Sequence, residues 1–427
     1  MKINIKSILI NLRHQPVVSV VSIIGTALAI FLIMIVVMIS DIGITPYAPE
    51  SNRDRFLHHT WTSIVQIEKK QFGSNGPMSY ETFKSLFSPL TTPEAVTAYK
   101  QVYTEAILQE REGTPAEVGY KKVDDAYWKV FDYTFVAGRP FDKAEADAGM
   151  PLAVITANTA RAVFGSTDVV GREVLLNYAP YRVVGVVKDV PSQSARTFAH
   201  VFVPILSENK NEWNSGIMGD ISVTILARDR GDFDKIREEF NRRVESVNKE
   251  IASTGWEIQT LGRPYDQELE SYVKSSFTEP DKATARRRNL IIYAILLLVP
   301  AINLSSMTES RLRGRIAEIG VRRAFGCTRF ETMMTILGEN LVVTVVAGAI
   351  GLLLSVVFAY FAQDYIFSMR TVGSVPGVGL PLVSMLNWMT FFRAFVFCFI
   401  LNLLSTGIPA WRASRMNIVN AISGLRK

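Results

Sequence analysis

Cysteine and histidine are scarce in this sequence. Two cysteines, Cys327 and Cys398, occur among its 427 residues, which excludes a disulfide scaffold and a cysteine-rich zinc site. The histidines are too few and too scattered for a metal site: His14, His58, His59 and His200. We therefore expect no metal and no cofactor-binding residue in this chain.

Charged residues are scarce as well. They make up 20% of the chain, and hydrophobic residues make up 48%, whereas a soluble protein carries about 25% charged residues. The mean hydropathy is accordingly positive, at +0.18. This composition excludes a disordered chain and predicts membrane-spanning segments.

Four apolar stretches are long enough to span a bilayer, which takes roughly 20 apolar residues in a helix. The first, Val17 to Ser40, has no charged residue. Cleavage as a signal peptide is the alternative, but the run is longer than a usual signal sequence and no A-x-A site follows it. The last contains Arg393, whose long side chain can reach the interface. The predicted transmembrane helices are 17–40, 289–308, 340–363 and 388–408.

The positive charge predicts that both termini lie in the cytoplasm. Basic residues outnumber acidic ones in the N-terminal segment 1–16, the loop 309–339 and the tail 409–427, and loops of this kind stay on the cytoplasmic side. The net charge of +6 then reflects a surface facing anionic lipid, with no need for nucleic acid. The run Arg286 to Arg288 would lie outside, as long translocated segments permit, and 364–387 would form a short periplasmic loop.

The large external segment 41–288 predicts a folded domain of mixed structure. Its apolar stripe within Phe233 to Ile251 has helical spacing. Short apolar runs bounded by turn residues predict strands at Ile64 to Ile67, Leu152 to Ile155, Tyr181 to Val187, Val201 to Ile205 and Ile221 to Leu226. We therefore expect four transmembrane α-helices and a large mixed α+β periplasmic domain inserted between the first and second helices. Gly165 to Gly171 does not have phosphate-loop spacing, and we expect no catalytic site.

The loop 309–339 predicts a short amphipathic helix. Leu312, Ile316 and Ile319 recur at helical spacing beside charged residues, and Gly326 ends the helix. Two interpretations of this pattern stay open. The helix either passes force between a cytosolic partner and the membrane, or anchors arginines to lipid headgroups.

A second helix is expected directly after this one. Thr328 and Glu331 have the spacing of a capping box. Apolar residues then continue from Phe330 through Leu337 toward the third span. The amphipathic helix is thus predicted to join that span through a short turn.

The loop resembles a known family. The run Glu318 to Gly326 (EIGVRRAFG) resembles the EIG(I/V)RRALG signature of MacB/FtsX-type ABC transporter permeases, where this segment is the coupling helix that docks on the ATPase. Pro409 to Arg415 resembles the segment after that family's last membrane helix. Cys327 and Thr328 depart from the usual Ala-Ser pair, and Ile418 stands where proline is common. The ATPase-coupling residues implied by the resemblance are Ile316, Glu318, Ile319, Gly320, Val321, Arg322, Arg323 and Gly326.

The external segment resembles the MacB-type periplasmic core domain. The resemblance lies in Asp132 to Phe141, Ala160 to Gly165, Gly171 and Tyr181 to Pro191. In the MacB/LolC-like branch a smaller subdomain is inserted into a larger one. That implies an insert over roughly 121–190.

Together these resemblances imply the membrane subunit of a type VII ABC transporter in the bacterial inner membrane. Such a permease works by mechanotransmission: ATPase closure moves the coupling helix, and the motion reaches the periplasmic domain. Its task would be export or extraction of a periplasmic or membrane-associated substrate such as a peptide, lipoprotein or toxin. The alternative is a signalling or sensor subunit that activates an envelope enzyme. A secondary transporter is disfavoured because the spans hold no buried acidic residue for an ion relay.

The expected partners follow from the same resemblance. The sequence has no Walker A motif, so the chain is expected not to be an enzyme. ATP and Mg²⁺ would bind a separate ABC ATPase, present in two copies. A second permease chain, identical or homologous, is expected, as are membrane lipid and either a periplasmic adaptor or an outer-membrane duct. No nucleic acid is expected.

Specific roles are expected within the coupling helix. Ile319 would fill an apolar pocket on the ATPase, and Arg322 and Arg323 would pair with its acidic rim. Gly320 would permit close approach of the partner, and Gly326 would stop the helix.

Overall fold

The computed structural model has two compact units. The first, here called the helical unit, comprises the described residues of Met1–Ile42, Ala283–Ala362 and Met385–Lys427. The second, the mixed unit, comprises those of Gly43–Lys282 and Gln363–Ser384. The structure describes residues 16–70, 72–100, 103–192, 194–208, 216–273, 275–366, 375 and 388–416. Three parts of the predicted organisation lie outside the described residues. They are residues 1–15 of the N-terminal segment, most of the loop 364–387, and the tail from residue 417, which includes Ile418.

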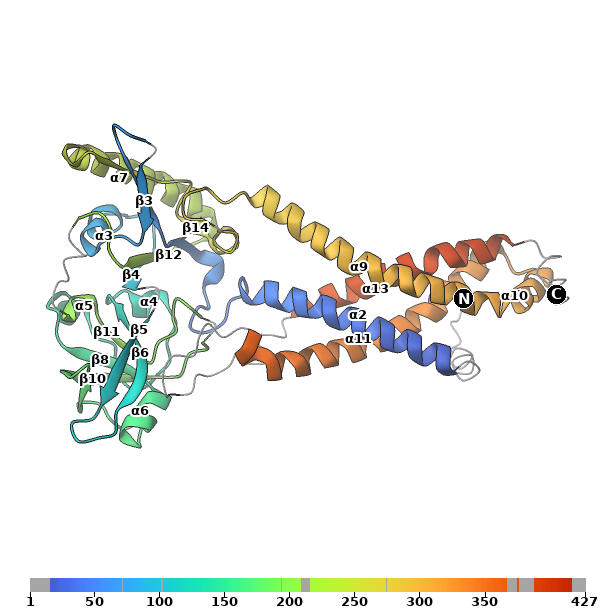
Figure 1. Cartoon of the computed structure of the whole chain (residues 1–427), viewed down its shortest axis with the longest axis horizontal. Helices are drawn as coiled ribbons and strands as arrows, with labels where there is room; N and C mark the ends of the chain where they lie inside the picture. The colour runs from blue at the N-terminus through green and yellow to red at the C-terminus, as the bar shows by residue number, and fades with distance from the viewer. Residues whose placement is uncertain are drawn as a thin grey trace. The chain divides into compact units, whose positions relative to one another are not determined.

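Each predicted span lies within one long helix of the helical unit (Figure 1). The helices of this unit are α2 (Pro16–Ile42), α9 (Lys282–Arg313), α10 (Ile316–Ala324), α11 (Arg329–Ile366) and α13 (Trp388–Arg415). Among the described residues, Val20–Met38 in α2 and Arg329–Phe361 in α11 are long and apolar enough to cross a membrane. Because α11 begins at Arg329, the predicted second loop helix and the third span form one continuous helix.

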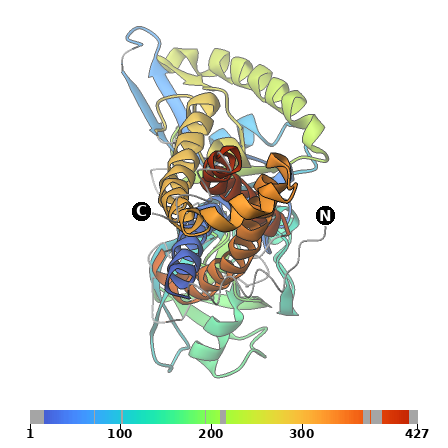
Figure 2. The same ribbon diagram turned by 90° about the vertical axis from the view of Figure 1, so that its right-hand side faces the viewer.

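The long helices meet through a small apolar cluster. Ile30 and Met34 of α2 pack with Ala301 of α9 and Leu401 of α13, and Leu352 of α11 lies against them. The helices approach closely enough that a Cβ on Gly351 of α11 would lie 2.5 Å from the carbonyl oxygen of Ala27 in α2. Small residues permit such close helix contacts in membranes. Figure 2 views these helices nearly end-on.

The mixed unit contains a large sheet and a small one. The large sheet has the order β11-β8-β10-β9-β5-β6-β4-β12-β1-β14, with β7 beside β10, and the small sheet has the order β13-β2-β3. The strands are β1 (Phe56–His59), β2 (Thr62–Gln66), β3 (Gly73–Gly76), β4 (Ala95–Lys100), β5 (Thr104–Gln109), β6 (Ala116–Val123), β7 (Phe135–Gly138), β8 (Leu152–Thr156), β9 (Glu173–Leu176), β10 (Ala179–Val187), β11 (Val201–Pro204), β12 (Ile221–Leu226), β13 (Trp256–Gln259) and β14 (Tyr265–Asp266). The predicted strands are confirmed as β2, β8, β10, β11 and β12.

Part of the large sheet closes into a ring. β11 pairs in parallel with β6 and antiparallel with β8, so that β6, β11, β8, β10, β9 and β5 follow one another around a barrel. Buried side chains fill its interior, among them Leu108, Val118, Ile155, Val183 and Val203. The predicted insert, roughly 121–190, lies within the stretch that builds this ring, and its bounds stay a prediction.

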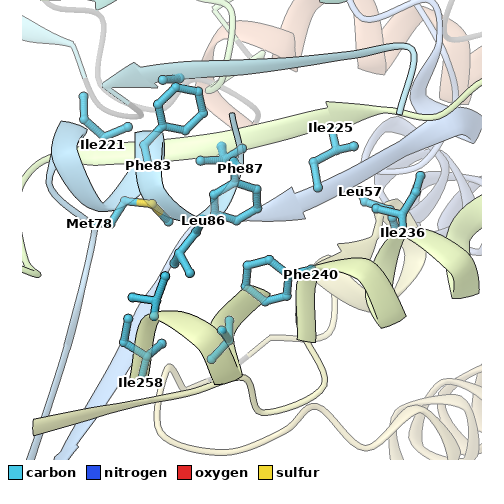
Figure 3. Close-up of a cluster of buried hydrophobic side chains, with 14 of the residues drawn as sticks. Leu57, Met78, Phe83, Leu86, Phe87, Ile221, Ile225, Ile236, Phe240 and Ile258 are labelled. Atoms are coloured by element: carbon cyan, nitrogen blue, oxygen red, sulfur yellow. The ribbon is translucent and has the colours of Figure 1, made fainter. Parts of the chain in front are cut away.

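A second core lies between the remaining strands and two helices (Figure 3). The helices of the mixed unit are α3 (Tyr80–Leu86), α4 (Tyr127–Val130), α5 (Lys143–Asp147), α6 (Ala157–Phe164), α7 (Phe233–Ile251) and α8 (Gln267–Glu270). The predicted stripe of α7 is confirmed, because Ile236 and Phe240 are fully buried against Phe87 and Ile225. The charged face of α7 stays exposed, as expected for an amphipathic helix.

Two glycines in the mixed unit have the same backbone conformation but different surroundings. Gly138 at the end of β7 and Gly165 after α6 both have left-handed φ, +69° and +71°. A Cβ on Gly138 would overlap the carbonyl oxygen of Val184, whereas a Cβ on Gly165 would meet nothing within 4 Å. Both residues lie in the runs that resemble the MacB-type domain.

We predict that Gly165→Ala lowers the free energy of unfolding by about 1 to 2 kcal/mol, because alanine is strained at a left-handed φ. Gly138→Ala should cost roughly 1 to 3 kcal/mol more, because the methyl group must displace the neighbouring strand. Thermal unfolding of the two purified variants measures the difference. Equal losses in the two variants would contradict the close contact between β7 and β10.

Candidate functional site

The short helix α10 connects α9 to α11. It runs from Ile316 to Ala324 and is followed by Phe325 and by Gly326, whose φ of +98° lies in the left-handed region. Glycine is favoured there because it has no Cβ. The predicted helix stop at Gly326 is confirmed.

The predicted capping box is also present at the start of α11. The backbone N–H of Thr328 donates to Glu331 Oε2 over 2.9 Å, and the backbone N–H of Glu331 donates to Thr328 Oγ1 over 3.2 Å. This reciprocal pair satisfies two otherwise unpaired donors at the helix end. The hydrogen bonds to Thr328 hold the pKa of Glu331 below its usual value.

Ile319 points into the protein. Its side chain is 8% exposed and packs with Leu312 of α9, Ile336 of α11 and Ala413 of α13. Ile319 thus packs against the chain's own helices, in contrast to the expectation that it is free to fill a pocket on an ATPase. Leu312 and Ile319 are covered by the chain's own helices, whereas Ile316 is half-buried, and periodicity alone does not show what covers an apolar face.

Arg315 fixes the start of α10 to α11. Its guanidinium pairs with Glu318 Oε2 at 2.9 Å and with Glu339 Oε2 at 2.6 Å. Burial by itself lowers the pKa of Arg315, but its hydrogen bonds and charge interactions with the two carboxylates outweigh burial and raise it. The same hydrogen bond to Arg315 lowers the pKa of Glu318.

Arg323 fixes the other end of the helix. One of its guanidinium nitrogens donates to the carbonyl oxygen of Met416, just beyond α13, over 2.6 Å. Arg323 is thus turned toward its own chain, whereas Arg322 is exposed and pairs with Glu318 at 2.7 Å. Both arginines were expected to pair with an acidic rim on the ATPase, and Arg322 is the one that lies on the outer face of α10.

The outer face of α10 carries exposed apolar side chains. Val321 is 45% exposed and Phe325 is 90% exposed. Phe330, in the first turn of α11, is exposed as well. Among the predicted coupling residues, Glu318, Val321, Arg322 and Gly326 are exposed, Ile316 and Arg323 are half-buried, and Ile319 and Gly320 are buried. The sequence analysis did not predict that Phe325 and Phe330 are exposed. The available signal was their position on either side of the turn at Gly326, in a loop rich in charged residues.

A cluster of buried charges lies where the mixed unit follows α2 in the chain. Glu50 is fully buried and accepts hydrogen bonds from Arg53 Nε over 2.7 Å and from Thr197 Oγ1 over 3.0 Å. Arg53 also donates to Tyr47 Oη over 3.0 Å. Burial alone would raise the pKa of Glu50, but the charges of Arg53 and Arg196 outweigh it and lower the pKa. The carboxylate is therefore held ionised inside the protein.

The same region holds the segment that precedes α9 in the chain. The side-chain amide of Gln267 donates to the carbonyl oxygen of Gly43 over 2.7 Å, and its Oε1 lies 2.7 Å from His58 Nε2. Thr60 Oγ1 donates to Glu270 over 2.5 Å. The segment after α2 and the segment before α9 are thus bound to each other within one unit.

We predict that Glu50→Gln lowers the free energy of unfolding by about 3 to 5 kcal/mol, because Arg53 would remain buried without its partner. Lys235→Met is the control, since the pair of Lys235 with Asp232 is exposed and such pairs contribute about 1 kcal/mol or less. Thermal unfolding of the purified chain measures both. A loss at Glu50 as small as that at Lys235 would show that the buried pair is not a stabilising contact.

Two family models match the chain. The MacB-like periplasmic core domain matches residues 19–243, more than half of the chain, and the FtsX-like permease C-terminal model matches residues 290–418. The chain belongs to the MacB/FtsX-type ABC transporter permeases. This permease is therefore an inner-membrane protein with a large periplasmic domain. The MacB-like model begins within α2 and covers the mixed unit as far as α7, and the FtsX-like model covers α10 and the helices around it.

Curated relatives carry the same assignment. The macrolide export ATP-binding/permease protein MacB of Salmonella paratyphi A is 23% identical over 372 residues, covering 85% of this permease and 52% of the relative. The permease thus spans about half the length of that relative. The uncharacterized ABC transporter permease YknZ of Bacillus subtilis is 22% identical over 306 residues, covering 70% of this permease and 68% of the relative.

Solved structures include similar chains. The periplasmic region of MacB from Actinobacillus actinomycetemcomitans is 18% identical, with a TM-score of 0.33, and the match covers 48% of this permease and 89% of that chain. The extracellular domain of YknZ is 14% identical, with a TM-score of 0.33, covering 47% and 99% respectively.

Proposed function

We propose that this permease couples an ABC ATPase to its periplasmic domain, with the ATPase docking on the outer face of α10. The observation that carries the proposal is the exposed pair Val321 and Phe325 beside Arg322, on a helix whose opposite face is buried. Exposed aromatic residues next to arginine are the composition of a protein contact surface. The buried residues Ile319 and Gly320 hold the helix in place and need not touch the partner.

The contacts around α10 support transmission of force. Ile319, Arg315 and Arg323 join the helix to α9, α11 and α13. A push on α10 would therefore move the helices rather than bend the loop. At the periplasmic end, the contacts of Glu50 and Gln267 bind the segments that follow α2 and precede α9, so the motion of these helices would reach the domain together.

The assembly is proposed from the family. Each chain has one α10 and ABC ATPases act in pairs, so two permease chains, identical or homologous, would bind two ATPases, predicted on separate chains. The substrate would be a periplasmic or membrane-associated peptide, lipoprotein or toxin, with a periplasmic adaptor or outer-membrane duct as a further partner. A signalling subunit remains the alternative, and no contact in the described residues favours it.

The first test concerns the docking face. Phe325→Asp should weaken ATPase binding by at least about thirtyfold, the loss of a buried anchor worth roughly 2 kcal/mol. Phe277→Asp is the control, because Phe277 is a strongly exposed phenylalanine of the mixed unit, at 64%. Co-purification of the ATPase with each variant gives the answer.

Each outcome of this test is informative. Val321→Asp should behave like Phe325→Asp, and both variants should keep the melting temperature of the wild type because their side chains are exposed. Ile319→Asp should lower it, because the carboxylate would be buried without a partner. Retention of the ATPase by Phe325→Asp at the wild-type level would refute docking on this face.

The second test concerns topology, with four spans and both termini in the cytoplasm. In a chain whose native cysteines are replaced by serine, Ser310→Cys should be shielded from an impermeant thiol reagent in intact spheroplasts, and Ser88→Cys should react. Both serines are exposed, so access to the reagent depends on the side of the membrane alone. Labelling of Ser310→Cys before lysis would overturn the topology.

A further inference from the structure

A groove of about 190 Å³ opens between the end of α9, the start of α10 and the end of α13. Its walls are apolar in the middle and charged at the rim. The lining residues are Glu309, Leu312, Arg313, Ile316, Pro409, Arg412, Ala413 and Met416. The groove therefore offers an apolar surface and guanidinium groups side by side.

The groove lies directly beyond the apolar outer surface of the helices. Among the described residues of α9, the last strongly exposed large apolar side chain is Ile302, at 56%. On α13 the exposed apolar surface runs to Ile408, at 59%, and is followed by Trp411. The guanidinium of Arg415 stacks 4.5 Å from the Trp411 ring. Tryptophan and arginine at the end of an apolar helix surface mark the level of the lipid headgroups.

The rim of the groove carries an excess of positive charge. Arg313 pairs with Glu309 at 3.0 Å. Arg412 is exposed and forms no hydrogen bond or ion pair with any other residue that the structure describes. A guanidinium in this position can bind a phosphate with two parallel hydrogen bonds.

We propose that this groove binds one anionic phospholipid of the cytoplasmic leaflet. Arg412 would hold the phosphate, and the first part of an acyl chain would lie along Ile316, Pro409 and Met416. Basic pockets between membrane helices on the cytoplasmic side are a known kind of headgroup site. The proposal rests on the topology given above, but it does not depend on the ATPase.

The lipid site and the proposed ATPase face lie on different sides of α10. Ile316 lines the groove, and Val321 follows five residues later, about 140° further around a helix. A lipid in the groove would contact α9, α10 and α13 together. It would therefore stabilise the junction that α10 depends on while leaving the outer face open.

Lipid binding to the purified full-length chain tests the proposal. Native mass spectrometry in detergent, with phosphatidylglycerol and phosphatidylcholine of identical acyl chains, gives the affinity for each. We expect wild type to bind phosphatidylglycerol about fivefold more tightly, because both lipids carry a phosphate but the choline cation of phosphatidylcholine offsets the attraction of Arg412, and one arginine contributes on that scale toward an anionic lipid. Arg412→Gln should remove this preference. Arg329→Gln, a matched exposed arginine outside the groove, should keep it.

A second variant tests the apolar wall. Ile316→Gln should weaken binding of both lipids equally, because it changes the surface under the acyl chain and leaves Arg412 in place. Inorganic phosphate should not displace phosphatidylglycerol.

Four outcomes would overturn the proposal. Equal affinity of wild type for the two lipids would show that the groove does not recognise an anionic headgroup. Equal loss of the preference for phosphatidylglycerol in Arg412→Gln and Arg329→Gln would indicate an effect of diffuse surface charge. Displacement by inorganic phosphate would indicate a site for the free anion. Loss of the ATPase from Arg412→Gln with unchanged lipid binding would assign the groove to the ATPase. None of the lipid measurements needs ATPase, so they can succeed if the coupling proposal fails.

Discussion

The burial of Ile319 fixes how α10 packs against α9, α11 and α13. With this side chain packed against Leu312, Ile336 and Ala413, the rotation of α10 about its axis is fixed. Val321 and Phe325 must then face outward, and Ile316 must line the groove beside α13. An apolar contact is suited to this role because it is not screened by salt as an ion pair is and does not depend on the protonation of nearby groups.

A different kind of interaction holds the segment that follows α2. Glu50, Arg53 and Thr197 bind through short, directional hydrogen bonds in a buried site. Replacing such a pair with apolar residues of similar size is often neutral or stabilising, so its presence is weak evidence of stability alone. What the pair does provide is a hydrogen-bonded geometry for the chain just after α2, which the proposed transmission of force requires.

Local patterns were enough to predict much of the architecture. The stripe of α7, the capping box of Thr328 and Glu331, the stop at Gly326 and five strands depend on residues close in sequence, and all are present. The inward direction of Ile319 was not predictable, because a helix pattern reveals an apolar face but not what covers it. The closed ring and the Glu50 site were missed because they depend on pairings between distant segments, such as Glu50 with Thr197.

The closed ring of strands has a consequence for the synthesis of this protein. β11 completes the ring by pairing with both β6 and β8, and it is the last of the ring strands in chain order. Until Val201 to Pro204 has been translocated, the partly formed barrel has two unpaired edges and an open apolar interior. Such edges are prone to pairing with other chains, and pairings between distant segments form slowly. The barrel core therefore stays open until β11, the last ring strand to be synthesised, has paired with β6 and β8.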